Sequence, residues 1–224
     1  MKQRLQNLCD SRVTALIVLQ IVPLIPTLIT VCANFSVAAL IAFLIAIAIA
    51  LWLISGLVKV QKGALEAGTN TIRRFMKFEY VLMWILAVIL ALETLLGLAV
   101  IGEADQPLYP ILLIVGLFAF MVYTLIAVRA LKNTARLAHD IASGTESVGC
   151  QGKLPEISCL ISIVLPLLSL LLPAVFKTAF HPELEKQMTF SGITFTSFLN
   201  TALTIIRAII SYSLLRDFRK AVNE

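Results

Sequence analysis

The sequence predicts an all-α, polytopic integral membrane protein with six transmembrane helices arranged as three helical hairpins. Six stretches are apolar and long enough to cross a bilayer, and basic residues gather in alternate connections. Of the 224 residues, 59% are hydrophobic, and the mean hydropathy is +0.95. A spanning helix needs ~20 apolar residues, because the hydrocarbon core is ~30 Å thick. Helices are expected because open sheet edges cannot be satisfied in hydrocarbon, and the alternating pattern of a membrane barrel is absent.

The six expected spans cover residues 13–33, 35–58, 80–101, 108–128, 157–176 and 193–215. Short connections join each outward helix to a return helix, which gives three hairpins. Each return helix continues beyond the membrane as a basic helical extension. Spans and connections use nearly the whole length, so we expect a single transmembrane domain over residues 1–224.

The first span carries Pro23 and Pro26, which predict a kink because a helical proline lacks the N–H and clashes with the preceding turn. A basic start, an apolar run and the small residues Val31-Cys32-Ala33 also resemble a secretory signal. The length of the run, its prolines and the immediate second span favour a membrane helix.

The second span contains small residues four apart, a pattern typical of tight helix packing in lipid. These residues are Ala38, Ala42, Ala46 and Ala50. We expect Gly68-Thr-Asn to end the extension of this helix. The following residues 71–78 mix basic and bulky apolar side chains. We expect them to lie at the membrane surface, with Arg73, Arg74 and Lys77 near lipid head groups.

Two ionisable residues lie well inside expected spans: Glu93 in the third and Arg207 in the sixth. A charge near the bilayer centre costs ~2.5–3.5 kcal/mol on insertion scales, so such residues usually pair or line a polar cavity. On the expected topology they differ in depth by ~8 Å and lean toward each other. A structural ion pair, or an arginine that reaches the head groups, is the non-functional alternative.

Polar stripes on spans one, five and six are expected to face the interior of the bundle. The sixth span carries a stripe of small and hydroxyl residues with Asn200 and Arg207 beside it. Together with the two charges, these stripes predict a polar site near the midplane. Its expected residues are Gln20, Glu93, Asn200, Thr204 and Arg207.

The distribution of charge predicts the orientation. The net charge is +5, and outside the spans all lysines and arginines fall on one side except Lys177 and Lys186. The positive-inside rule then places both termini in the cytoplasm of an inner or plasma membrane. Anionic phospholipid head groups, and not nucleic acid, are the expected partners of these residues.

The sequence contains no recognisable catalytic motif. Cys9, Cys32, Cys150 and Cys159 lack metal-site spacing, so neither a zinc site nor a structural disulfide is expected. His139 and His181 fall near opposite membrane faces. We therefore expect no cofactor and no metal.

The leading functional hypothesis is a small transporter or channel-like protein for an ion or small molecule. The second is a non-catalytic partner protein, such as an assembly factor, an accessory subunit or an immunity-type inhibitor, which would bind another protein or a second copy. The third is an intramembrane lipid-modifying enzyme. A polar cavity would favour the first, a solid core the second, and a lateral opening the third.

Overall fold

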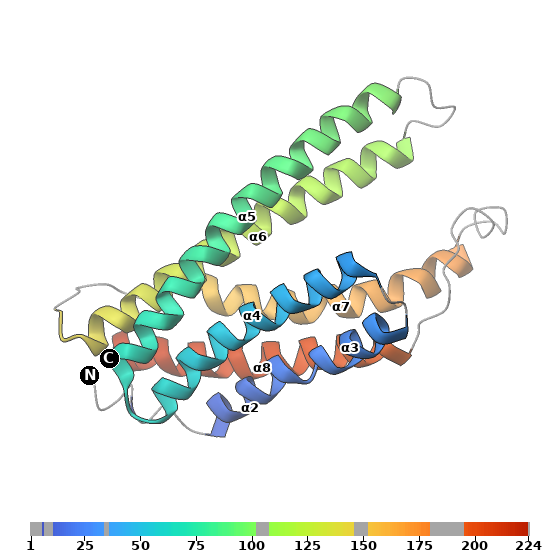
Figure 1. The fold of residues 1–224 in the computed structure, drawn as a ribbon. Helices are drawn as coiled ribbons and strands as arrows, with labels where there is room; N and C mark the ends of the chain where they lie inside the picture. Colours follow the sequence, from blue (N-terminus) through green and yellow to red (C-terminus); the bar gives the residue numbers. More distant parts are fainter. Residues whose placement is uncertain are drawn as a thin grey trace.

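The structure, a computed structural model, describes residue 6 and residues 11–33, 36–101, 108–145, 152–179 and 195–223. These residues form helices and no strand, which confirms the predicted all-α class. The helices are α2 (Ser11–Ile21), α3 (Leu24–Ala33), α4 (Val37–Gln61), α5 (Leu65–Ile101), α6 (Leu108–Ala142), α7 (Leu154–Ala179) and α8 (Phe195–Asn223). They converge at the end where α2 begins and α8 ends, whereas the α5–α6 hairpin diverges toward the opposite end (Figure 1).

The first expected span is a broken helix. A turn at Val22 and Pro23 separates α2 from α3. Pro23 has no N–H and its ring clashes with the preceding turn, so a straight helix through this point is disfavoured. The turn keeps local hydrogen bonds, from Val22 N to the Val18 oxygen at 3.0 Å and from Ile25 N to the Val22 oxygen at 3.2 Å. The predicted kink is therefore a division into two short helices.

The fourth helix begins directly after Ser36, whose side-chain hydroxyl accepts a hydrogen bond at 3.1 Å from the backbone N–H three residues on. Such a cap satisfies one of the N–H groups left free at a helix start. Along α4, Ala38 and Ala42 are exposed, and Ala46 and Ala50 are half-buried. Tight packing along this seam stays a prediction.

The α4–α5 hairpin closes tightly through glycine. Its turn covers residues 62–64, where Gly63 has a φ of 82°, a conformation that favours glycine. Deeper in the hairpin, a Cβ on Gly68 would lie 2.7 Å from Val60 N and 2.9 Å from the Gly56 oxygen. The expectation that the helix ends at Gly68 is wrong. This glycine lies inside α5, where the missing side chain allows the two helices to touch.

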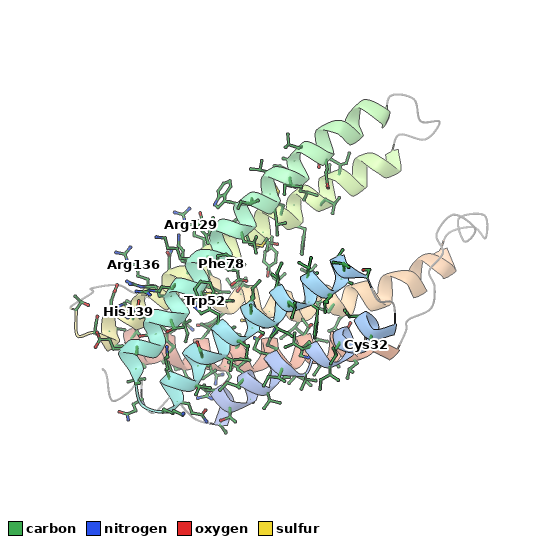
Figure 2. All side chains as sticks on the ribbon, viewed as in Figure 1. Cys32, Trp52, Phe78, Arg129, Arg136 and His139 are labelled. Atoms are coloured by element: carbon green, nitrogen blue, oxygen red, sulfur yellow. The ribbon has the colours of Figure 1, made fainter. Side chains whose placement is uncertain are left out.

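Aromatic side chains fill the space between α4 and α5 beyond the glycine contact. The ring of Trp52 lies 5.9 Å from the ring of Phe75 and 5.5 Å from that of Phe78 (Figure 2). On its other side, α5 packs along α6, where Thr69 Oγ1 lies 3.4 Å from His139 Nδ1. The three helices α4, α5 and α6 thus form one packed layer at the convergent end.

A small apolar core joins α6 to α8 at this same end. Ile141 and Phe218 are buried against each other, and partly buried side chains surround them: Leu137, Ala138 and Val222. The eighth helix also packs along α7 and against α2. The convergent end is therefore where all the chain's long helices are connected.

Three described helical segments are long and apolar enough to cross a membrane: Val37–Gln61, Leu65–Thr94 and Ile114–Ala142. On these segments the large apolar side chains of Leu44 and Phe118 are 56% exposed, and that of Trp84 is 50% exposed. Such surfaces are typical of lipid-facing helices and indicate a membrane protein. Two further apolar segments are shorter than these three, with 10–17 residues each: Ser11–Ile21 in α2 and Leu154–Leu167 in α7. Length and hydropathy of the described helices therefore support three membrane crossings, and the predicted count of six stays a prediction.

Candidate functional site

The convergent end holds a polar junction at which α5, α6, α7 and α8 meet. We use the name polar junction for these side chains: Glu79 of α5, Tyr123 of α6, Glu156, Ser158, Cys159 and Ser162 of α7, and Arg207 and Arg219 of α8. Each comes from a helix that is otherwise mostly apolar, so these groups are candidates for chemistry or binding.

Glu79 of α5 and the exposed Arg207 of α8 are within electrostatic range of each other, and no ion pair joins them among the described residues. Glu79 is a half-buried carboxylate on α5 that interacts electrostatically with Arg207 of α8. The buried thiol of Cys159 on α7 also lies within electrostatic reach of Arg207. Arg207 is thus within electrostatic range of side chains on both α5 and α7.

A hydroxyl group connects α6 to α7 beside this pair. The Tyr123 hydroxyl donates a hydrogen bond of 2.9 Å to the backbone oxygen of Ser158. The Ser162 hydroxyl donates to the same oxygen at 2.8 Å and lies beside the tyrosine hydroxyl. The buried Ser158 hydroxyl in turn donates to the Pro155 oxygen at 2.7 Å. The polar groups of α7 are thus satisfied locally and by α6.

A forked ion pair fastens the start of α7 to the end of α8. Arg219 donates from Nε to one carboxylate oxygen of Glu156, and from Nη2 to the other at 3.2 Å. The Glu156 side chain is only 8% exposed, so this charge needs its partner. Two parallel bonds between planar groups also fix the orientation of the two helices.

A second ion pair ties α2 onto α8. Arg12 Nη1 donates to Asp217 Oδ2 at 2.6 Å and to the Ser213 hydroxyl at 2.8 Å. The hydrogen bond from Arg12 holds the pKa of Asp217 below its usual range, although partial burial opposes this shift. The first and last described helices are therefore held at the same end of the molecule.

The structure gives Arg207 a different acidic neighbour from the one expected. Glu93 is exposed on α5 and has no recorded ion pair in the described part of the chain. It lies fourteen residues beyond Glu79, which is ~21 Å along a helix. Among the described residues, the acid that interacts electrostatically with Arg207 is Glu79, and no ion pair joins Glu93 to Arg207. Sequence reasoning began the third span at residue 80, whereas α5 begins at Leu65, so Glu79 fell outside the expected span and was not considered as a site residue.

The other expected site residues are dispersed. Gln20 is half-buried on α2 and Thr204 is half-buried on α8, whereas the side chain of Asn200 lies outside the described residues. Of the expected head-group residues, Arg74 and Lys77 are exposed and the half-buried Arg73 donates to Asn70 at 3.1 Å; their role stays a prediction. The grouping of these residues near the midplane stays a prediction.

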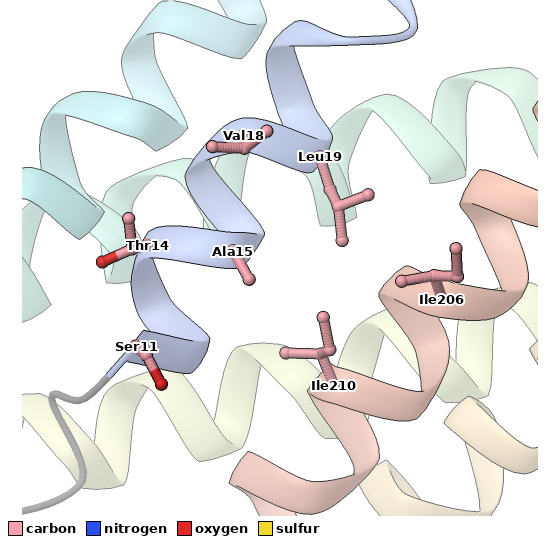
Figure 3. Close-up of a pocket in the computed structure, with 7 residues that line it drawn as sticks. All are labelled: Ser11, Thr14, Ala15, Val18, Leu19, Ile206 and Ile210. Atoms are coloured by element: carbon pink, nitrogen blue, oxygen red, sulfur yellow. The ribbon is translucent and has the colours of Figure 1, made fainter.

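An apolar groove of about 500 Å³ lies between α2 and α8 (Figure 3). Its lining residues are Ser11, Thr14, Ala15, Val18, Leu19, Ile206 and Ile210. Only two hydroxyls, at one end, interrupt the apolar walls, so the groove offers little to a charged solute. Within the described residues, no group of three or more His, Cys, Asp or Glu side chains is arranged to hold a metal ion.

No protein-family model matches the sequence, and neither a curated protein nor a solved structure is detectably similar to it. The polar junction is therefore the feature of the described residues that bears on function. Its groups are opposite charges, hydroxyls and a buried thiol, a set suited to binding an ion or small polar solute and poorly suited to covalent catalysis.

Proposed function

We propose that this chain is a small transporter or channel-like protein for an ion or small polar solute. The observation that carries the proposal is Glu79 of α5, a half-buried acid within electrostatic range of the exposed Arg207 of α8, in helices that otherwise expose apolar side chains. Glu79 adjoins Tyr80, a residue type common at the membrane–water interface, so these charges would lie at the mouth of a pathway, and charged residues in membrane helices mark ion or substrate pathways. In this proposal the acid binds a cation or proton, and the base neutralises it when the site is empty.

The arrangement of the helices supports this proposal. The α5–α6 hairpin meets α7 and α8 at the convergent end and separates from them toward the other end (Figure 1). Tyr123 and Glu79 supply polar links across the junction, to Ser158 and Arg207. In an alternating-access cycle one helix group rocks against another, and a hairpin that meets its neighbours mainly at one end would suit such a motion.

The proposed topology has six crossings and both termini in the cytoplasm. The Arg12–Asp217 ion pair supports it, because the start of α2 and the end of α8 must share a side when the number of crossings is even. The basic extensions gather at this same end, and the positive-inside rule assigns such an end to the cytoplasm. The convergent end would then be the closed cytoplasmic side.

Flux through proteoliposomes tests the function. The purified full chain would be reconstituted in vesicles, and H⁺, Na⁺, K⁺ and Cl⁻ fluxes would be compared with those of protein-free vesicles. We expect flux of at least one of these ions, and a loss of at least tenfold in Glu79→Gln and in Arg207→Met. Glu93→Gln is the matched control, because it removes an exposed acid from the same helix.

Two results would contradict the proposal. One is a wild-type chain that moves none of these ions faster than empty vesicles. The other is a full flux in Glu79→Gln combined with a loss of flux in Glu93→Gln. Glu93, and not Glu79, would then be the acid that transport requires. An inert chain that co-purifies with a second protein from its native membrane would instead support the partner-protein alternative.

A further inference from the structure

The outer side of the α5–α6 hairpin carries cations next to aromatic rings. We call this surface the basic-aromatic face; it consists of Arg73, Lys77, Tyr80 and Trp84 of α5 and Arg129, Lys132 and Arg136 of α6. Residues spaced three and four apart lie along one side of a helix. The two rows adjoin, because Lys132 Nζ lies 3.9 Å from the centre of the Tyr80 ring.

The positive charge of this face is largely uncompensated. In the described part of the chain, no acid lies within ion-pair distance of Lys77, Arg129 or Lys132. Arg136 has Asp140 at 3.7 Å, but its own side chain is 76% exposed. Of the other acids on the hairpin, Glu66 lies in the first turn of α5, Glu79 is within electrostatic range of Arg207 of α8, and Glu93 lies nine residues beyond Trp84. Figure 2 shows Arg129 and Arg136 projecting from the same side of the hairpin.

The aromatic residues mark the depth of this face in the bilayer. Tyr80 and Trp84 lie one turn apart with ring centres 6.4 Å apart, and Trp84 is 50% exposed. Exposed tyrosine and tryptophan collect at the membrane–water interface, with the charged parts of lipids at the same level. Lys132 contacts the Tyr80 ring, and Lys77 and Arg73 precede Tyr80 by about one and two turns, so these cations are expected at the height of the head groups.

We propose that the basic-aromatic face binds the head groups of anionic phospholipids, with Lys132 and Arg129 contacting phosphate while Trp84 lies against the acyl chains. Each lysine or arginine held near an anionic surface contributes ~1 kcal/mol, which is about fivefold in affinity. Arginine adds two parallel bonds to a phosphate, and lysine adds a point charge. This lipid site does not depend on the proposed transport, and the chain's two tryptophans provide a way to test it separately.

The sequence holds two tryptophans, so Trp52→Phe leaves Trp84 as the sole fluorescent reporter on the face. The full chain would be reconstituted in vesicles of brominated phosphatidylglycerol mixed with plain phosphatidylcholine, and in the reverse mixture. We expect the anionic lipid to quench Trp84 with a relative binding constant at least fivefold above that of phosphatidylcholine. Salt at 1 M should reduce this preference, because the screening length falls to ~3 Å.

Charge variants decide whether the face causes the preference. Lys132→Gln and Arg129→Gln should each lower it by up to about fivefold, and Lys132→Arg should retain it. Lys62→Gln is the matched control, since this exposed lysine lies on the α4–α5 turn outside the face. The exposed position of Arg129 keeps its variant informative even where Lys132→Gln fails to fold.

Three outcomes would overturn the proposal. Equal quenching of Trp84 by the two lipids is the first. A preference that survives both Lys132→Gln and Arg129→Gln is the second, because the cations would then be irrelevant. The third is an equal loss of preference in Lys62→Gln, which would show a general effect of net charge and not a local site.

Discussion

Replacing Gly68 with alanine should destabilise the α4–α5 hairpin. The new Cβ would lie 2.5 Å from Val60 Cγ2, 2.7 Å from Val60 N and 2.9 Å from the Gly56 oxygen. Two of these three atoms are backbone, so the helices must separate to admit the methyl group. Overpacking typically costs ~1–3 kcal/mol, and alanine recovers ~1 kcal/mol through its higher helix propensity. Because two of the clashing atoms are backbone, we place the overpacking cost in the upper part of that range, at ~2–3 kcal/mol, which leaves a net loss of ~1–2 kcal/mol.

Thermal unfolding in detergent, followed by the fluorescence of Trp52 beside this contact, provides the measurement. For a chain of this size, 1 kcal/mol corresponds to ~2–4 °C in Tm, so Gly68→Ala should unfold ~2–8 °C lower than the wild type. The matched control is Gly116→Ala in α6, where a Cβ would meet nothing within 4 Å, and its Tm should stay the same or rise. The reasoning is refuted if the two alanine variants unfold at the same temperature.

Three further predictions concern other contacts of the convergent end and the thiols. The pKa of Asp217 is lowered in the folded chain, so its ion pair with Arg12 stabilises the fold at pH values above the ordinary pKa of 3.8, and this stabilisation is lost as the pH falls through the folded pKa. Arg12→Gln should therefore lower the free energy of unfolding by up to ~1 kcal/mol at pH 7. The unfolding curves of variant and wild type should approach each other at acidic pH. Tyr123→Phe removes one neutral hydrogen bond between α6 and α7 and should cost ~0.5–1.5 kcal/mol in the same unfolding assay, with an unchanged free energy arguing against the contact. In single-cysteine variants, N-ethylmaleimide should modify Cys32, which is exposed, at least tenfold faster than Cys159, which is 7% exposed, as followed by mass spectrometry; equal rates would contradict the packing of α7.

The local features of the fold were accessible from sequence because they follow from hydropathy and backbone chemistry. The all-α class follows from long apolar stretches in which only helices satisfy every backbone group. The break of the first span follows from Pro23, whose ring and missing N–H act within one turn. Where a residue permits two local interpretations, this reasoning failed: Gly68 suits a helix end as well as a close contact, and only the neighbouring α4 backbone distinguishes them.

The candidate site was only partly accessible. Arg207 stood out as a charge in an apolar stretch, but its partner could not be inferred, because Glu93 and Glu79 lie on the same helix at different heights. The choice between them depends on which end of α5 approaches α8. Likewise, no local pattern connects Arg12 with Asp217, which are 205 residues apart.

The sequence by itself determined that the chain is helical, that its helices suit lipid, and that its basic residues gather in a few segments between and beyond the apolar stretches. Only the tertiary structure decided which helices meet, which acid faces Arg207, and which cations share the outer side of the α5–α6 hairpin. The physical reason is that burial of apolar area provides little drive between helices in lipid. Neighbours are then selected by close backbone contact at glycine and by individual polar bonds, and these depend on groups far apart in the chain.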